Sequence, residues 1–240
     1  MTETLLRIRG LSKSFGGVIA NADVDFELPA GGIASIIGPN GAGKTTFISM
    51  VSGHLKPTAG SIEFRGRDVT RLSVEKRARL GISRKFQTPS IFPNLSVWEN
   101  VELAVLASRR RPRDSVGRIA QVLDLVRLVE FAEYKAVSLS HGQRQWLEIG
   151  LLLGNDADLL LLDEPTAGMT AAETHATAEL IRRLSRELGL SAVIIEHDIQ
   201  FIRDLRAPVT VLHLGRVFAQ GSFEAISADE RVRSIYLGKA

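Results

Sequence analysis

The chain has 240 residues, a length that suits one α/β domain with an inserted subdomain. Hydrophobic residues make up 45% and charged residues 24%, so a buried core is expected and disorder is not. The net charge of +3 is too small to indicate a nucleic-acid partner, and the lack of cysteine excludes disulfides and thiolate metal sites. We find no secretory signal and no apolar run near the roughly 20 residues of a membrane span, so we expect a cytoplasmic location with peripheral membrane contact at most.

The first third of the chain predicts strands around a glycine-rich loop and a short helix. Alternating or continuous apolar residues predict strands at Leu5–Arg9, Val18–Leu28, Ile33–Ile37 and Ser61–Phe64. Helical spacing over Lys44–Ser52 predicts a helix, and Gly53 is a suitable residue to end it.

The middle of the chain has the spacing of helices. Apolar residues recur at i, i+3 and i+4 over Val97–Ser108, Ser115–Val129 and Gln143–Leu153. We therefore expect a helical insertion over about Phe86–Asn155. After it, strands at Leu159–Leu162, Ala192–Ile195 and Pro208–Leu214 alternate with helices at Ala171–Leu188 and Ile199–Leu205. Strands that alternate with helices of this length indicate a parallel sheet.

The segment GPNGAGKTT matches the phosphate-binding pattern G-x-x-x-x-G-K-[ST], and it lies between a predicted strand and a predicted helix, as the pattern requires. Its glycines allow backbone N–H groups to turn toward phosphate oxygens, and the helix dipole adds positive potential there. We expect Lys44 to reach the β- and γ-phosphates and the Thr45 hydroxyl to ligate Mg²⁺. The expected nucleotide-binding residues of this loop are Gly38, Pro39, Asn40, Gly41, Ala42, Gly43, Lys44, Thr45 and Thr46.

Polar residues that follow later strands are expected at the same edge of the sheet. Asp163 and Glu164 follow the buried strand Leu159–Leu162 at its carboxyl end, where open α/β sheets bind ligands. We expect Asp163 to hold Mg²⁺ through water and Glu164 to polarise an attacking water. His197 follows the apolar strand AVIIE and could donate to the γ-phosphate or to the water. Gln87 could contact the metal or the water, although the local sequence gives little support for this role.

The cluster LSHGQ at Leu139–Gln143 has three interpretations. A hydrolase with Ser140 as nucleophile and His141 as base is disfavoured, because adjacent side chains point apart and no G-x-S-x-G elbow is present. A zinc site is disfavoured because the five histidines lack ligand spacing. The third interpretation is a helix N-terminus that meets an anion through a serine hydroxyl and free N–H groups.

Taken together in this order and spacing, these motifs resemble those of the ATP-binding-cassette (ABC) ATPase family over essentially the whole chain. The resemblance implies an α/β fold: a P-loop NTPase core with a mostly parallel sheet, an N-terminal antiparallel β subdomain and an inserted α-helical subdomain. It implies a single domain over residues 1–240, in which residues 1–85 and 156–240 form the core. Residues 86–155 would then form the helical subdomain that carries the signature loop.

The resemblance also implies the role of LSHGQ, since the family signature reads Leu-Ser-Gly-Gly-Gln. In such proteins this loop caps the γ-phosphate of ATP bound by the opposite subunit of a head-to-tail dimer. Ser140, Gly142 and Gln143 match the signature, and His141 replaces its first glycine. A second departure is TAGMT, which follows Pro165 where many members have Ser-Ala-Leu-Asp, so the expected dimer-contact loop lacks its aspartate.

Four further residues match family positions outside the loops already described. Glu164 matches the catalytic base, His197 the switch histidine, and Gln87 the residue that links the nucleotide site to the membrane partner and also contacts the metal. Phe15, in KSFGG, matches the aromatic residue that stacks on adenine; an ordinary core phenylalanine is the alternative interpretation.

Within the family, the segments LSHGQRQWLEIG, EPTAGMT, IIEHD and SIYLG resemble ATPases of importers for hydrophobic amino acids and amides. The urea importer is the most similar, and branched-chain amino acid import is the close alternative. This implies ATP and Mg²⁺ as cofactors, a second and different ATPase subunit, and permease subunits at the cytoplasmic face of the membrane. It also implies, indirectly, a periplasmic or extracellular substrate-binding protein, and no nucleic acid.

Two alternative functions and two interpretations of a basic segment were also considered. An ATPase for lipopolysaccharide export is an alternative, although its signature and switch contexts differ more from this chain. A soluble mechanical ATPase acting on DNA or ribosomes is disfavoured, because neither long heptads nor a second phosphate loop is present. The basic run at 108–114 is interpreted as a solvated loop, with contact to anionic lipid as the alternative.

Overall fold

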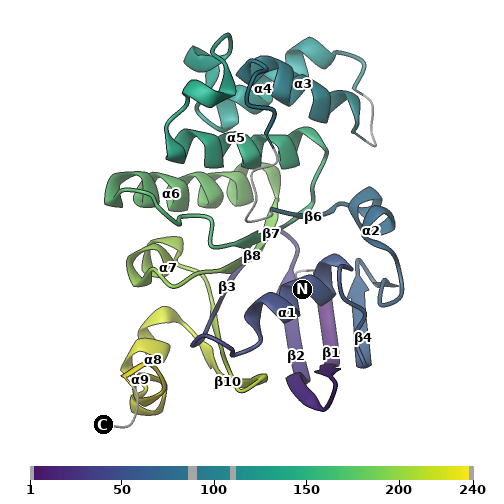
Figure 1. Cartoon of the computed structure of the whole chain (residues 1–240), viewed down its shortest axis with the longest axis vertical. Coiled ribbons are helices and arrows are strands. Elements are labelled where there is room, and N and C mark those ends of the chain that lie inside the picture. The colour runs from purple at the N-terminus through teal and green to yellow at the C-terminus, as the bar shows by residue number, and fades with distance from the viewer. Residues whose placement is uncertain (1–2, 86–90, 109–111, 238–240) are drawn as a thin grey trace.

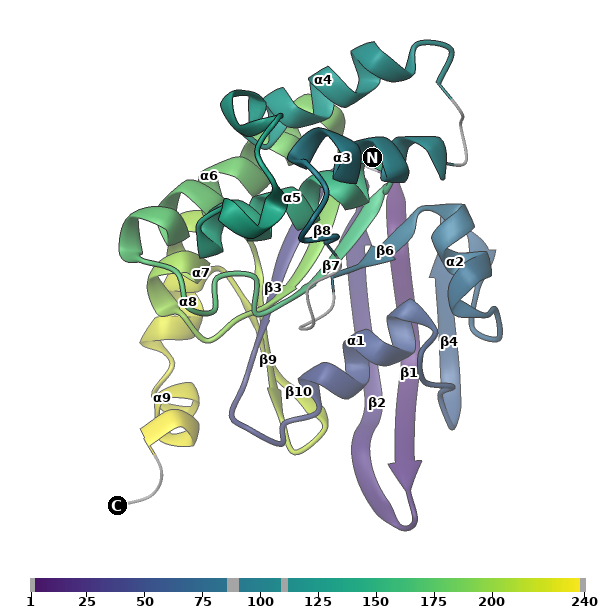
Figure 2. The ribbon, with the colours of Figure 1, turned by 45° about the horizontal axis from the view of Figure 1, so that its top comes forward.

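A computed structural model of the chain describes residues 3–85, 91–108 and 112–237 (Figure 1, Figure 2). The strands are β1 Thr4–Phe15, β2 Val18–Pro29, β3 Ile33–Ile37, β4 Ala59–Phe64, β5 Arg67–Asp68, β6 Ile82–Arg84, β7 Leu159–Asp163, β8 Ser191–Ile195, β9 Val209–His213 and β10 Arg216–Gly221. The helices are α1 Lys44–Ser52, α2 Val74–Leu80, α3 Val97–Leu106, α4 Ser115–Leu125, α5 His141–Gly154, α6 Ala171–Leu188, α7 Ile199–Leu205, α8 Phe223–Ala228 and α9 Glu230–Leu237. Two short 3-10 helices, η1 Val129–Phe131 and η2 Ala136–Ser138, precede α5.

The strands form two sheets. The first is antiparallel in the order β2-β1-β4-β5, and the second has the order β10-β9-β3-β8-β7-β6. In the second sheet all neighbours are parallel except β10, which runs antiparallel to β9. The predicted mostly parallel sheet with an N-terminal antiparallel region is therefore confirmed.

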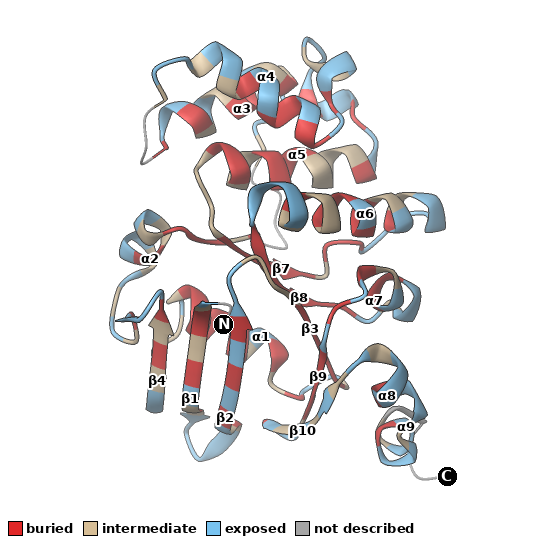
Figure 3. Cartoon of the chain, turned by 180° about the vertical axis from the view of Figure 1, so that it is seen from behind, coloured by how far each residue is buried: buried red, intermediate tan, exposed pale blue. Residues whose placement is uncertain are grey.

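Both faces of the parallel sheet are covered, because successive side chains of a strand point to opposite faces. On β7, Leu159 and Leu161 join the core cluster that contains α1, whereas Leu160 and Leu162 join the cluster that contains α5 and α6. Figures 1 and 2 both show α1 on one side of these strands and α5 and α6 on the other. In Figure 3 the central strands are buried along their length, which explains their continuous apolar sequences.

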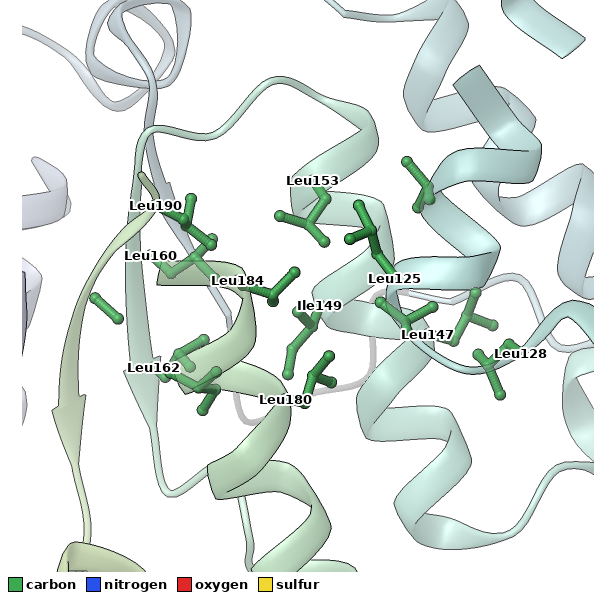
Figure 4. Packing of buried hydrophobic residues seen from close by; sticks show 14 of the residues in the cluster. Leu125, Leu128, Leu147, Ile149, Leu153, Leu160, Leu162, Leu180, Leu184 and Leu190 are labelled. Carbon is green, nitrogen blue, oxygen red and sulfur yellow. The ribbon is translucent and has the colours of Figure 1, made fainter. Parts of the chain in front are cut away.

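Leucine is the most frequent residue in the core between the sheet and helices α3 to α6. Figure 4 shows Leu160 and Leu162 of β7 beside Leu180 and Leu184 of α6, and the side chains of α5 lie next to them. Helices α3, α4 and α5 also pack on one another. This packing makes α5 a bridge between the other inserted helices and the sheet.

Short local signals set the helix boundaries. Thr170 caps α6 through a capping box with Glu173, and Gly53 in the left-handed region ends α1. The predicted bounds of α1, α6, α7 and β3 are confirmed. Helix α4 ends at Leu125, four residues before the predicted end, because Arg127 adopts a positive φ of 59°.

The end of β1 and the start of α5 also differ from their predicted positions. Strand β1 extends to Phe15 instead of Arg9, because Gly16 and Gly17 both have positive φ and form a tight hairpin turn into β2. Helix α5 begins at His141 instead of Gln143, since Ser140 is its N-cap. No described helix is both long enough and apolar enough to cross a membrane.

Candidate functional site

The glycine-rich loop after β3 is a backbone cradle. Gly43 is the N-cap of α1 with φ of 97°, and a Cβ atom there would lie 2.3 Å from the carbonyl oxygen of Ala20. No side chain caps the first N–H groups of this helix, so they face the cavity with the positive end of the helix dipole. The cavity is lined by residues 40–46 together with Ala20, Glu164, Ile195 and His197.

The ammonium group of Lys44 lies within this cradle. Its Nζ donates hydrogen bonds to the carbonyl oxygens of Gly38 at 2.7 Å and Pro39 at 3.0 Å. Burial lowers the pKa of Lys44, and the carboxylates of Glu164 and Asp163 oppose this shift. These contacts hold the Lys44 side chain against the backbone of the loop, and its contact with the β- and γ-phosphates stays a prediction.

Asp163 lies beneath the cavity and does not line it. The side chain is 3% exposed, and its Oδ2 accepts a hydrogen bond from Arg84 Nη2 at 3.2 Å. Burial raises the pKa of Asp163, and Arg84 counteracts this effect. Arg84 also donates to Ser49 Oγ at 2.8 Å, which connects the end of β6 to α1. Sequence analysis missed Arg84, because nothing in its local pattern indicates a partner 79 residues away.

The side chains of Glu164 and His197 meet at the edge of the cavity. Glu164 Oε1 lies 3.1 Å from His197 Nε2, and both side chains are about 40% exposed. The backbone N–H of Glu164 donates to the carbonyl oxygen of Ile195 at 2.9 Å, and its φ is 50°. This left-handed conformation turns the chain directly after the buried Asp163. The structure therefore brings together the phosphate loop, Glu164 and His197.

The loop Leu139–Gln143 lies elsewhere, at the start of α5 on the opposite face of the sheet from α1, and none of its residues lines this cavity. Ser140 Oγ accepts from the Gln143 backbone N–H at 3.2 Å, and Gln143 Oε1 accepts from the Ser140 N–H at 2.8 Å. This reciprocal capping box fixes the start of the helix.

Two contacts join this loop to the segment after β7. His141 Nε2 is 2.7 Å from the carbonyl oxygen of Ala167, and Ser140 Oγ donates to Glu173 Oε1 at 3.3 Å. A Cβ atom on Gly142 would lie 2.5 Å from Glu173 Oε1, so the approach of this carboxylate requires glycine at that position. His141 therefore has a structural contact inside the chain, and Glu173 is a neighbour of the loop that sequence analysis missed.

Two predicted residues remain. Phe15 is 46% exposed at the end of β1, with Lys13 Nζ 5.0 Å from its ring centroid, so the interpretation of Phe15 as a core residue is wrong. Gln87 lies outside the described residues, as do positions 109–111 of the basic run.

Comparison with known proteins identifies the family. The family model described as ABC transporter matches residues 22–167. The branched-chain amino acid transport ATP-binding protein LivG of Salmonella typhimurium is 34% identical over 255 aligned residues, which cover 100% of both chains.

Two solved structures agree with this. The ADP conformation of MJ1267, an ATP-binding cassette of an ABC transporter, has a TM-score of 0.89 at 28% identity and covers 99% of this chain and 100% of that one. A dimeric post-hydrolysis state of the cassette MJ0796, bound to ADP and Pi, has a TM-score of 0.77 at 25% identity, with coverage of 91% and 99%. The chain belongs to the ABC transporter family and is an ATP-hydrolysing, nucleotide-binding subunit of the branch that contains the branched-chain amino acid transport ATPases.

Proposed function

We propose that the chain powers import of branched-chain or other hydrophobic amino acids through a membrane permease. The observation that carries its catalytic part is the cavity in which the phosphate loop meets Glu164 and His197. The substrate class is supported by LivG, whose name specifies branched-chain amino acid transport and which aligns with the whole chain. Urea, the substrate favoured in the sequence analysis, is named by none of the three proteins described above and stays a prediction.

In the proposed reaction the phosphates of ATP bind to the N–H groups of the loop and to the ammonium of Lys44. A water attacks the γ-phosphorus, the bond from that phosphorus to the bridging oxygen breaks, and ADP departs with that oxygen. Glu164 accepts the proton that the water loses. The contact with His197 orients the Glu164 carboxylate, and the imidazole can donate to the γ-phosphate. Phe15 is proposed to stack on the adenine, which its exposure permits.

Mg²⁺ fits the donors at this site. The hydroxyl of Thr45, which lines the cavity, and the carboxylate of Asp163 behind it are the oxygen ligands that Mg²⁺ prefers. We propose that these two residues hold the ion, Asp163 through water. When bound, the ion would neutralise charge on the β- and γ-phosphates. A contribution from Gln87 to the metal, and its link to the permease, stay predictions.

We further propose that two ATPase subunits dimerise head to tail, with Ser140, Gly142 and Gln143 of one subunit on the γ-phosphate bound by the other. The proposal is supported by the position of this loop, which lies away from the cavity of its own chain. It is also supported by the dimeric state of the related cassette MJ0796. A partner subunit of different sequence is our expectation from the importer branch.

The remaining parts of the proposal concern assembly. Residues 86–155 would act as one helical subdomain on the core formed by residues 1–85 and 156–240, since α3, α4 and α5 pack on one another. Permease subunits would hold the chain at the cytoplasmic face of the membrane, and a periplasmic or extracellular binding protein would deliver the substrate.

The experiment that tests this function is purification of the complete transporter with its permease and binding protein, followed by reconstitution into lipid vesicles. We expect ATP-dependent uptake of labelled leucine, and no uptake by a complex that carries Lys44→Ala. ATP-dependent uptake of labelled urea without uptake of leucine would overturn the amino acid assignment and support the urea assignment. ATP hydrolysis without uptake of either compound would overturn both.

A further inference from the structure

Glu196 is a buried carboxylate at the end of β8 that neither the sequence analysis nor the proposed reaction uses. Its side chain is 4% exposed. Its Oε1 accepts from the backbone N–H of Thr166 at 3.0 Å and from the Thr166 hydroxyl through a short hydrogen bond. Its Oε2 accepts from the backbone N–H groups of His197 at 2.8 Å and Asp198 at 3.3 Å. One carboxylate therefore holds four donors.

These donors come from two different loops. Thr166 belongs to the loop after β7, two residues beyond Glu164, whereas His197 and Asp198 form the loop after β8. Each Glu196 oxygen accepts from one loop, so the side chain joins the two loops. The same two loops carry Glu164 and His197, whose side chains are 3.1 Å apart.

The backbone N–H donors of two loops require two acceptor oxygens at this place. An ionised glutamate only accepts hydrogen bonds, whereas a glutamine would present an NH₂ group to one of the two loops and oppose its donors. Within the described ranges no cation forms a salt bridge with Glu196. Hydrogen bonds to both oxygens therefore satisfy this buried side chain. A carboxyl group held in this way fixes the geometry of both loops.

The same loop also sets the start of the next helix. Asp198, one of the Glu196 donors, is the N-cap of α7, and its Oδ1 accepts from the N–H groups of Gln200 at 2.8 Å and Phe201 at 3.0 Å. Phe201 is fully buried in the core. His197 is thus held between Glu196 and a helix anchored in the core, so its backbone has little freedom to move.

We propose that Glu196 is a positioning residue for ATP hydrolysis, which holds Glu164 and His197 in register by cross-linking the loops after β7 and β8. This inference rests on the proposed roles of Glu164 and His197 in the reaction. A displacement of about 1 Å in a catalytic group can lower a rate by about 100-fold, so the loss of one oxygen acceptor under these loops has a measurable consequence.

The test compares Glu196→Gln with wild type in the complete transporter. We expect kcat for ATP hydrolysis to fall by about 10- to 100-fold, while the Kd for ATP stays within about 2-fold, because the phosphate loop is untouched. A kcat within about 2-fold of wild type, or an equal loss of ATP binding, would overturn the inference.

A second readout distinguishes positioning from a purely structural role. In the isolated full-length chain, the ring signals of His197 can be followed by NMR. In Glu196→Gln their chemical shifts are expected to move, as they are in Glu164→Gln, because both changes alter the contact between the His197 ring and the Glu164 carboxylate. Unchanged His197 ring signals in Glu196→Gln, with changed ones in Glu164→Gln, would overturn the inference.

Two further variants keep the test decisive. If Glu196→Gln does not fold, Thr166→Val removes one donor to Oε1 and preserves side-chain shape and the backbone N–H. We expect a smaller fall in kcat with ATP binding retained, and an unchanged kcat would overturn the inference.

Glu164→Gln tests the proposed function separately. Normal turnover in that variant refutes the base assignment. Loss of turnover in Glu164→Gln together with normal turnover in Glu196→Gln refutes only the positioning role.

Discussion

The phosphate loop and the signature loop are both helix N-termini with N–H groups that can bind an anion, but they are constructed differently. The loop before α1 is fixed by glycine conformation and close backbone contact, and its Lys44 is 7% exposed. The loop before α5 is capped by its own Ser140, and Ser140 and His141 are exposed. The phosphate loop lines a cavity together with Glu164 and His197, whereas the signature loop is exposed away from that cavity. One chain can therefore bind ATP in its own cavity and present its signature loop to a second molecule.

This contrast predicts unequal effects of substitution, and the largest concerns the enclosed half. Glu164→Gln is expected to retain ATP binding and to lose turnover by about 10²- to 10⁴-fold, because the amide cannot accept the proton of the attacking water. Phosphate release and gel filtration with ATP would measure the loss and the trapping of a nucleotide-bound dimer. Normal turnover would exclude Glu164 as the base.

Lys44→Ala is expected to weaken ATP binding by about 100-fold, because it removes charge-assisted contacts to the phosphates. Equilibrium binding of a fluorescent ATP analogue to the isolated chain measures this change. Lys76→Ala, at an exposed position in α2, is the matched control and is expected to bind normally. Equal affinities of the wild type and Lys44→Ala would refute the phosphate cradle.

Ser140→Arg tests the outward-facing half. We expect turnover to fall by at least about 10-fold, because the arginine fills the anion site and removes the N-cap, while ATP binding by the single chain remains unchanged. Ser138→Arg, an exposed position two residues earlier, is the control for adding charge near the loop. Loss of ATP affinity in the isolated Ser140→Arg chain would contradict the assignment of this loop to a second subunit.

The smallest expected effect lies outside both loops, at a contact between α6 and α7. His175 on α6 is 2.8 Å from Asp204 on α7, and the hydrogen bond to Asp204 raises the pKa of His175 above its usual value of 6.5. The protonated form is therefore favoured by folding, so the stabilisation is complete below pH 6.5 and is lost as the pH rises through the raised pKa. His175→Gln should lower the free energy of unfolding in urea at pH 5.5 and leave it almost unchanged at pH 9. The same loss at both pH values would show that charge is not the cause.

Local signals allowed accurate prediction where the relevant contacts are local. The strand-loop-helix unit over 33–53 was predicted with correct boundaries, because strand burial, glycine conformation and the C-cap at Gly53 depend on neighbouring residues. Helix α6 was predicted for the same reason. In contrast, the end of β1 was placed six residues early, since the residues after Arg9 lack the apolar alternation of a strand and are extended through pairing with β2 and β4.

The residues of the site differ in the same way in how far the sequence predicts them. Its expected residues Lys44, Glu164 and His197 follow from motifs and from the rule that parallel strands present their carboxyl ends at one edge. The partners that hold them do not, because hydrogen bonds such as Arg84 to Asp163 and Thr166 to Glu196 join positions 79 and 30 residues apart. Glu196 even reads as the last residue of an apolar strand, and only its burial beneath two loops reveals four donors.

Residue spacing and the backbone preferences of single residues were thus enough to predict the main strands and helices, the phosphate loop and the residue types at the sheet edge. They did not predict β5, β10, α2, α8 or α9. Tertiary structure alone decided that Asp163 lies buried against Arg84, that His141 and Ser140 contact the segment after β7, and that Glu196 joins the loops carrying Glu164 and His197. The physical reason is that a buried charge selects its partners by proximity in the folded chain, and sheet register creates that proximity between residues far apart in sequence.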